Sequence, residues 1–204
     1  MAAVVAVGAE AAASPAGAKG AVRVAVYCGS SRRSPEIYLE AARETGRVLA
    51  SRGHTLVYGG GRTGLMGAVA DAALESGGRV EGVIYDRFIE SDVHHRGLHV
   101  LTQVPDMRTR KAGLDERSDA FLVLAGGLGT LEELAEILSF RKLGFHSRPF
   151  VILNTRGFYD GLIAQLERFI EDDFDKPAIR NYLHVVDDPT QAIAHCESAD
   201  RTML

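Results

Sequence analysis

Short runs rich in β-branched residues alternate with segments of helical periodicity along most of the chain, and this alternation restricts the fold most strongly. Apolar residues recur every three or four positions in segments 106–117, 131–143 and 159–171, and earlier helices are expected to begin near Ser34 and Leu65. The predicted strands are residues 22–28, 54–58, 79–85, 98–103, 119–124 and 149–154, with a last edge strand at 184–186. Alternating strands and helices form a mostly parallel sheet with helices on both faces. The predicted class is therefore an α/β, Rossmann-like three-layer sandwich.

The chain length indicates a single domain. The chain has 204 residues, of which 46% are hydrophobic and 25% charged, and this suits one domain with a full core over residues 21–204. Residues 1–20 are rich in alanine and glycine, lack a basic start, and are interrupted by Glu10. We therefore predict a disordered tail there rather than a signal peptide.

Charge and cysteine content narrow the classes of partner. A formal net charge of -4 provides no basic stripe for nucleic acid, so we expect a small-molecule partner. Cys28 and Cys196 are far apart and form no CxxC motif, so neither a disulfide framework nor a zinc site is predicted, and we expect no metal and no cofactor. No apolar run approaches the roughly 18 residues of a membrane span. The expected location is the cytoplasm.

The first glycine-rich loop, residues 59–67, lies between a predicted strand and a predicted helix. Its glycines would allow backbone N–H groups to approach a phosphate, and Gly59, Gly61 and Gly64 match the GxGxxG pattern of dinucleotide-binding folds. The acidic residue expected about 20 positions later is missing, because Glu81 lies within a predicted strand and Asp86 is late. Tight packing of helix against strand is the alternative explanation.

The second glycine-rich loop, residues 126–130, precedes the helix predicted at 131–143. Exposed N–H groups and the helix dipole favour an anion at such a position, and Thr130 adds a hydroxyl. The alternative is a capping box, in which Thr130 is the N-cap and Glu133 reaches back from the N3 position.

The helix predicted at 106–117 carries two cations on its apolar side. Met107 and Leu114 define the apolar stripe, and Arg110 and Lys111 follow Met107 by three and four residues. Cations on a buried face need partners, so Arg110 is expected to contact Glu133 or a bound anion. A solvated rim is the alternative.

Together these motifs resemble the LONELY GUY (LOG) family of cytokinin riboside 5'-monophosphate phosphoribohydrolases, older relatives of which were labelled lysine decarboxylases. The resemblance covers about residues 22–190 and includes the CGSS sequence at 28–31, the first glycine loop, the M-x-x-R-K pattern at 107–111, and PGGxGTxxE at 125–133. Ala125 replaces the proline of that last motif, which removes a fixed φ but leaves every glycine. The resemblance implies Arg110 and Glu133 as catalytic residues. The substrate-binding residues that it implies are Gly60, Gly61, Gly64, Met66, Asp92, Lys111, Gly126, Gly127, Gly129 and Thr130.

The resemblance implies hydrolysis of the N-glycosidic bond of N6-modified adenosine 5'-monophosphates by a homodimer, with water as the only co-substrate. The segment from Phe88 to Leu98 is expected near the base. A general nucleotide N-glycosidase and a non-catalytic nucleotide or cofactor carrier are the alternatives. A decarboxylase would need a lysine placed to hold pyridoxal phosphate, and no feature of the sequence singles one out.

Overall fold

The computed structural model describes residues 4–5 and 20–198, which contain one eight-stranded sheet in the order β1-β5-β4-β3-β2-β6-β7-β8. All neighbouring strands are parallel except β1 and β5, which are antiparallel. The strands are β1 (Val4–Val5), β2 (Arg23–Tyr27), β3 (Thr55–Tyr58), β4 (Arg79–Tyr85), β5 (Val100–Val104), β6 (Ala120–Val123), β7 (Phe150–Leu153) and β8 (His184–Val186).

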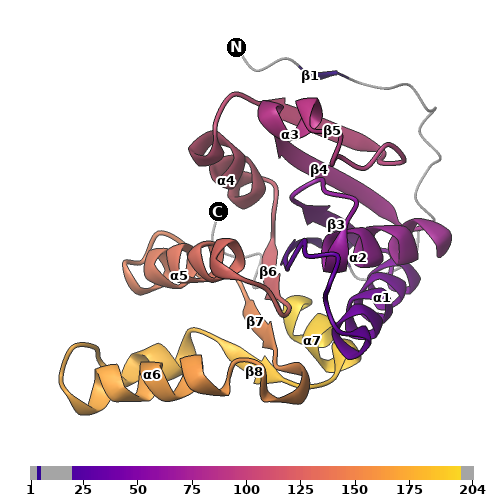
Figure 1. Cartoon of the computed structure of the whole chain (residues 1–204). Coiled ribbons are helices and arrows are strands. Elements are labelled where there is room, and N and C mark those ends of the chain that lie inside the picture. Colours follow the sequence, from indigo (N-terminus) through magenta and orange to yellow (C-terminus); the bar gives the residue numbers. More distant parts are fainter. Residues whose placement is uncertain (1–3, 6–19, 199–204) are drawn as a thin grey trace.

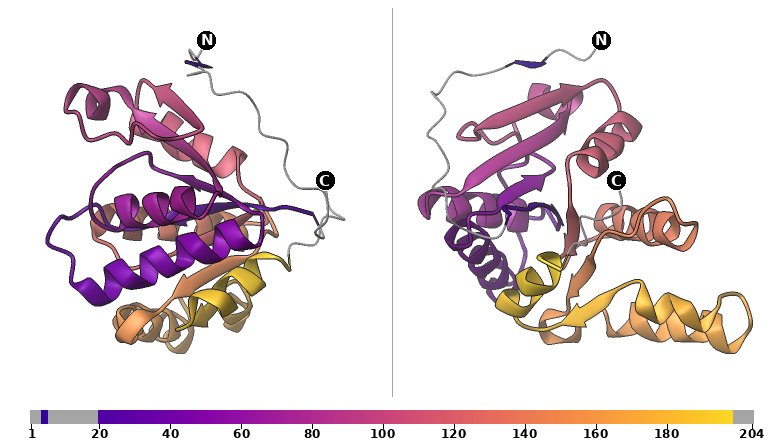
Figure 2. Two further views of the ribbon diagram at one scale, coloured as in Figure 1. Left: turned by 90° about the vertical axis from the view of Figure 1, so that its right-hand side faces the viewer. Right: turned by 180° about the vertical axis from the view of Figure 1, so that it is seen from behind.

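Helices cover both faces of this sheet (Figure 1). One face packs against α1 (Glu36–Ser51), α2 (Gly64–Glu75) and α7 (Pro189–Cys196). The other packs against α4 (Met107–Glu116), α5 (Leu128–Lys142) and α6 (Asp160–Glu171), and the two layers are visible on either side of the strands in Figure 2. A short helix α3 (Asp86–Glu90) and the 3-10 turns η1 (Thr155–Gly157) and η2 (Pro177–Asn181) lie in the connections.

Alternation of side chains along the strands produces the two cores. In β2, Val24 and Val26 face the core under α1, whereas Ala25 and Tyr27 face the core under α4 and α5. Both faces of the central strands are buried, which explains why these runs are apolar throughout rather than alternating with polar residues. The fold class predicted from the sequence is confirmed.

The element boundaries differ from the predictions in a few places. The helix predicted at 131–143 begins at Leu128, and the helix expected to begin near Ser34 begins at Glu36, with Pro35 as its N-cap. Met107, predicted to lie on the apolar stripe of α4, is exposed in the single chain. Helices α3 and α7 and strand β1 were not predicted from the sequence.

The tail predicted at residues 1–20 falls mostly outside the described residues. Of that segment, Val4–Val5 form β1 beside β5, and Gly20 is described. Across the described ranges 4–5 and 20–198, every helix is too short or too polar to traverse a bilayer.

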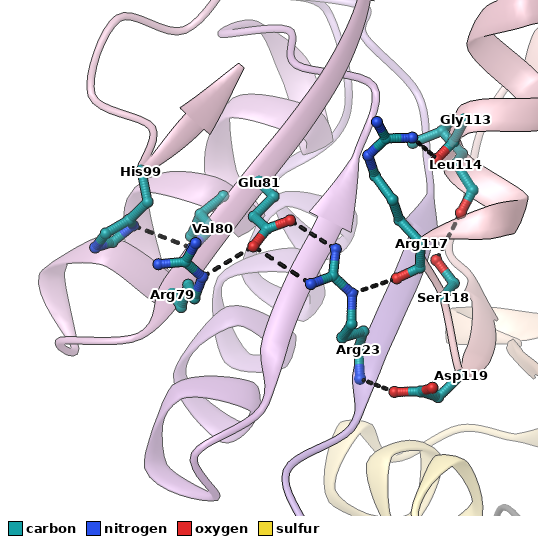
Figure 3. Close-up of polar contacts among 10 residues, drawn as sticks. All are labelled: Arg23, Arg79, Val80, Glu81, His99, Gly113, Leu114, Arg117, Ser118 and Asp119. Carbon is teal, nitrogen blue, oxygen red and sulfur yellow. Dashed lines mark hydrogen bonds and ion pairs between the residues drawn. The ribbon is translucent and has the colours of Figure 1, made fainter. Parts of the chain in front are cut away.

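A network of arginines surrounds Glu81 near the amino ends of the strands (Figure 3). Arg23 and Arg79 donate hydrogen bonds to the Glu81 carboxylate at 2.7 and 2.8 Å, and Arg23 also donates to the Arg117 carbonyl at the end of α4. The Arg23 backbone N–H is bound by Asp119. Glu81 therefore has a structural role at the edge opposite the glycine loops, and the dinucleotide interpretation has no acidic residue to bind a ribose.

Candidate active site

The candidate site lies at the carboxyl ends of the parallel strands, where the strand order reverses. The chain proceeds from β2 through β3, β4 and β5 on one side and returns to β6 on the other side of β2. The loops that follow β2 and β6 touch there: the Gly29 N–H donates to the Ala125 carbonyl at 3.0 Å, and a Cβ on Gly29 would lie 3.2 Å from the Gly126 Cα. The Leu65 N–H of α2 donates to the Gly29 carbonyl. Ligands of open α/β sheets bind at such a switch point.

Arg110 and Glu133 form a buried ion pair at this point. Arg110 is 5% exposed and Glu133 is 8% exposed, and Nη1 of Arg110 donates to Oε1 of Glu133 at 3.2 Å. The same guanidinium donates to the Val83 carbonyl at 3.2 Å and to the Gly59 carbonyl at 3.4 Å. Among the described residues, no other group donates a hydrogen bond to the Glu133 carboxylate, so this carboxylate has acceptor capacity left for a ligand. The predicted contact between Arg110 and Glu133 is thus present.

Gly59 provides the space that Arg110 occupies. A Cβ at this position would lie 1.8 Å from Nη2 of Arg110 and 2.5 Å from Cε of Met66. Glycine at the end of β3 is therefore required for Arg110 to reach its present place, and Met66 packs beside it.

Burial raises the pKa of Glu133 above its usual value, and the charge and hydrogen bond of Arg110 lower it in part. Burial likewise raises the pKa values of Tyr27, Cys28 and Tyr159, with the charge of Glu133 contributing in each case. These groups consequently stay neutral near Glu133. The Cys28 thiol is unsuited to act as a nucleophile, because the thiolate is the reactive form.

The second glycine loop contains two kinds of glycine. A Cβ on Gly126 would lie 2.2 Å from Oγ1 of the buried Thr130, so Gly126 is required by packing. Nothing lies within 4 Å of a Cβ on Gly127 or Gly129. Gly127 is the N-cap of α5 and provides no side-chain cap, so the N–H groups of the first turn are available to an anion.

The capping box considered for Thr130 and Glu133 is wrong. Helix α5 begins at Leu128, which places Thr130 third in the helix rather than at its N-cap. Glu133 instead faces Arg110. Local propensity favoured a start after the glycines, and the packing of Thr130 against Gly126 overrides it.

Packing accounts for the glycines of the first loop. Gly60 and Gly64 have φ of 73° and 60°, in the left-handed region that glycine tolerates best. A Cβ on Gly60 would meet Ile84 and Leu101, and one on Gly64 would lie 2.6 Å from the Ser30 carbonyl carbon. Gly61 pairs with His94 in a β-bridge. These contacts hold the first loop against Ser30 in the loop after β2 and against His94.

Asp92 and Lys111 already have protein partners. Asp92 has a φ of 51° and binds Arg62 and Arg96 at 3.1 and 2.8 Å. Arg62 lies in the first glycine loop, so this ion pair places Asp92 at the border of the site. Lys111 binds the Glu136 carboxylate at 3.2 Å and also pairs with Glu132 at 2.5 Å. Both side chains would have to exchange partners to bind substrate.

A hollow of about 320 Å³ lies between α1 and α2, away from Glu133, and is lined by residues that include Arg43, Arg47 and Glu75, together with Arg62 and Gly64 of the first glycine loop. Both arginines are paired with glutamates of α1. The buried pair and the open glycines are therefore the better guide to the chemistry. Within residues 4–5 and 20–198, no three His, Cys, Asp or Glu side chains gather to hold a metal ion.

Two contributors to the site were not predicted from the sequence. Gly29 brings the loop after β2 against Gly126, and Tyr159 donates a hydrogen bond from its hydroxyl to the Leu124 carbonyl at 2.8 Å. The CGSS sequence hinted at the first of these. Tyr159 follows β7, a strand without a glycine motif, so nothing in the sequence pointed to it.

Fold and site together define an α/β protein with a candidate ligand site at the switch point of its sheet, and comparison with known proteins identifies its family. A sequence profile described as "Possible lysine decarboxylase" matches residues 66–196. A cytokinin riboside 5'-monophosphate phosphoribohydrolase of Rhodococcoides fascians is 42% identical over 176 residues, which cover 86% of this chain and 89% of the relative. One from Arabidopsis thaliana is 40% identical over 159 residues, or 78% of this chain and 70% of the relative. The chain belongs to the LONELY GUY family, to which the older lysine decarboxylase label is attached.

Solved structures show the same fold. The molybdenum cofactor binding protein of Rippkaea orientalis superposes with a TM-score of 0.68 at 21% identity, covering 88% of this chain and 97% of that protein. The Moco carrier protein of Chlamydomonas reinhardtii gives a TM-score of 0.66 at 22% identity, covering 86% and 94%. At such identities the likeness concerns the fold alone.

Proposed function

We propose that this protein hydrolyses the N-glycosidic bond of N6-modified adenosine 5'-monophosphates to free base and ribose 5-phosphate. The observation that carries the proposal is the buried pair of Arg110 and Glu133 beside an open glycine loop. The names of the curated relatives support the choice of substrate. A decarboxylase is disfavoured because Lys111, at the border of the site, is held by two carboxylates.

The second glycine loop would bind the 5'-phosphate. The free N–H groups at the start of α5 and the helix dipole attract a phosphate dianion, and the absence of side chains at Gly127 and Gly129 allows close approach. We assign Gly126 and Thr130 to shaping this loop. Gly60, Gly61, Gly64 and Met66 are assigned to the wall that faces the ribose and base, with Asp92 and Lys111 at its border.

Glu133 would act at the other end of the sugar phosphate. Breaking the bond leaves positive charge on the ribose ring, and an ionised carboxylate in a buried setting stabilises that charge. Water supplies a hydroxyl to the anomeric carbon and a proton to the departing base. Arg110 offsets part of the rise that burial causes in the pKa of Glu133 and fixes the orientation of the carboxylate. An anion site and a carboxylate coexist because they address opposite ends of the substrate.

The test is incubation of the purified protein with isopentenyl-AMP and with AMP, followed by chromatography for free base. We expect rapid release of isopentenyladenine and slower release of adenine. Equal rates for both would support the general nucleotide N-glycosidase. Tight binding of nucleotide without release of base would support the carrier and contradict our proposal.

We further propose a cytoplasmic homodimer. Leu128 is 84% exposed, and Leu131 and Met107 are also exposed on the neighbouring ends of α5 and α4, beside the site. Leu134 and Leu138 of α5 belong to the core and are not part of this face. A twofold partner covering Leu128 would complete the pocket. A fully active monomer in light scattering would contradict the dimer.

A further inference from the structure

The turn between β7 and α6 buries a tyrosine beneath the second glycine loop. Tyr159 is buried, and its hydroxyl donates to the Leu124 carbonyl at 2.8 Å, which links positions 35 residues apart. Tyr159 belongs neither to the catalytic pair nor to either glycine loop. The hydrogen bond nevertheless ends on the chain segment that leads into the site.

Leu124 is the point at which β6 becomes the loop. Its N–H donates to the Tyr27 carbonyl of β2 at 2.9 Å, and the next residue, Ala125, accepts from Gly29. Gly127, three residues after Leu124, already caps α5. The Leu124 and Ala125 carbonyls are therefore two successive acceptors that fix the chain before the residues with open space, Gly127 and Gly129, and Tyr159 holds the first of them.

The turn itself is built around Tyr159. Its N–H donates to Oδ1 of Asn154 at 2.7 Å, and Nδ2 of Asn154 donates to Asp160 at 2.8 Å. Arg156 has a φ of 55°, and Gly157 has a φ of 69°. A non-glycine residue in the left-handed region persists where the surrounding structure determines it, and such residues concentrate near functional sites.

The surroundings of the hydroxyl keep it a donor. Burial raises the pKa of Tyr159, and the neighbouring Cys28 and Glu133 raise it further. The phenol stays protonated through the neutral range and donates to Leu124 throughout.

We propose that Tyr159 is a positioning residue for the phosphate-binding loop at residues 125–130. The inference rests on the proposed function, because it takes that loop to bind the 5'-phosphate. Without the hydroxyl, the Leu124 carbonyl is a buried acceptor without a partner, which is unfavourable. It regains a partner by turning toward water, and that rotation displaces Ala125 and Gly126. Phosphate binding must then reverse the displacement, so the loss is seen in affinity for the phosphate.

The experiment compares Tyr159→Phe with Tyr182→Phe in the full chain. Tyr182 is partly buried against the same core, and its hydroxyl makes no hydrogen bond to the described residues. Binding of ribose 5-phosphate is measured by calorimetry, and kcat and KM are measured with isopentenyl-AMP. We expect Tyr159→Phe to raise both the Kd for ribose 5-phosphate and the KM by about tenfold, the effect of ~1.4 kcal/mol. We expect kcat to change less than about threefold, because the Val83 and Gly59 carbonyls hold Arg110, and Arg110 holds Glu133, independently of Tyr159.

Unchanged Kd and KM in a folded Tyr159→Phe protein would overturn the inference. A loss of kcat at unchanged Kd would also overturn it, since Tyr159 would then act on Glu133 instead. A fall in Tm with normal kinetics would reduce Tyr159 to a packing residue. If the unaltered protein binds ribose 5-phosphate and releases base, and Tyr159→Phe does both equally well, only this inference fails. If the unaltered protein neither binds ribose 5-phosphate nor releases base, the proposed function fails as well.

Discussion

Two buried glutamates lie at opposite edges of the same sheet, and each is paired with arginine. Glu81 is 6% exposed and receives hydrogen bonds from Arg23 and Arg79, whose side chains are partly open to solvent (Figure 3). Glu133 receives one hydrogen bond from a single, buried arginine. Helix α4 joins the two sites, because Arg110 lies in its body and its C-cap residue Arg117 accepts from Arg23.

The difference lies in how completely each carboxylate is satisfied. Two arginines saturate Glu81, so it has little left to offer a ligand. Glu133 has spare acceptor capacity and a raised pKa, and groups with perturbed pKa values are typical of reactive sites. A buried ion pair is therefore informative about function only when its remaining hydrogen-bonding capacity is counted.

The comparison is tested most strongly by replacing Glu133. We expect Glu133→Gln to lower kcat by about a hundredfold or more, because the amide keeps the shape and loses the charge that stabilises the ribose cation. The measurement is the rate of base release at saturating isopentenyl-AMP. Circular dichroism should show an unchanged fold.

Arg110→Ala is the companion variant. If both residues act as a unit, the double variant should be little slower than either single variant. Near-normal turnover by a folded Glu133→Gln protein would remove Glu133 from the chemistry.

The pH dependence sharpens the comparison further. Ionised Glu133 is the active form, and its pKa is raised. As the pH is lowered, kcat/KM should therefore begin to fall at a higher pH than it would with a glutamate of ordinary pKa.

The raised pKa also affects stability, because it means that the folded protein favours the protonated form of Glu133. The stability that protonated Glu133 contributes is fully present below the pKa of this residue in the unfolded chain, and it is lost as the pH rises through its pKa in the folded protein. The Tm of Glu133→Gln minus that of the unaltered protein should consequently increase from pH 5 to pH 8. A difference that shrinks over this interval would contradict the assigned direction.

Replacing Glu81 should lower stability and leave turnover almost unchanged, which is the opposite of what we expect for Glu133. Glu81→Gln removes the charge that holds Arg23 and Arg79, and solvent compensates in part, so we expect a loss of about 1–2 kcal/mol and a Tm lower by several degrees. Turnover should stay within about twofold. Thermal unfolding and the base-release assay measure the two effects. A large loss of turnover at unchanged Tm would place Glu81 in the chemistry.

The smallest effect is expected for Glu132, the immediate neighbour of Glu133. Its side chain is 56% exposed and pairs with Lys111 at the rim, where such pairs contribute little. Glu132→Gln should change kcat/KM less than about threefold and should keep the acid limb of the pH profile. A hundredfold loss would mean that the two carboxylates share the task.

Much of this arrangement was predictable from the sequence for identifiable reasons. Periodicity revealed the strands and the main helices, and the spacing of Arg110 from Met107 indicated a buried cation that needed a partner. The start of α5 was not predictable from local propensity, because propensity favours a start after the glycines, whereas α5 begins at Leu128 and includes Gly129. Tyr159 was missed for a similar reason, since its hydrogen bond to Leu124 spans an intervening helix and strand. The sequence did not show which glycines are packed against neighbouring atoms and which have open space beside them, because this depends on the three-dimensional structure.

Gly59 has a consequence for how such proteins diverge. The space that a methyl group would fill at this position is occupied by the Arg110 guanidinium. One substitution to alanine would expel Arg110 and leave the open loop at Gly127 and Gly129 in place. A descendant of this chain could thus lose hydrolysis and retain nucleotide binding in a single step, so residue 59 is a place to look when a relative with the same fold is found to bind without reacting.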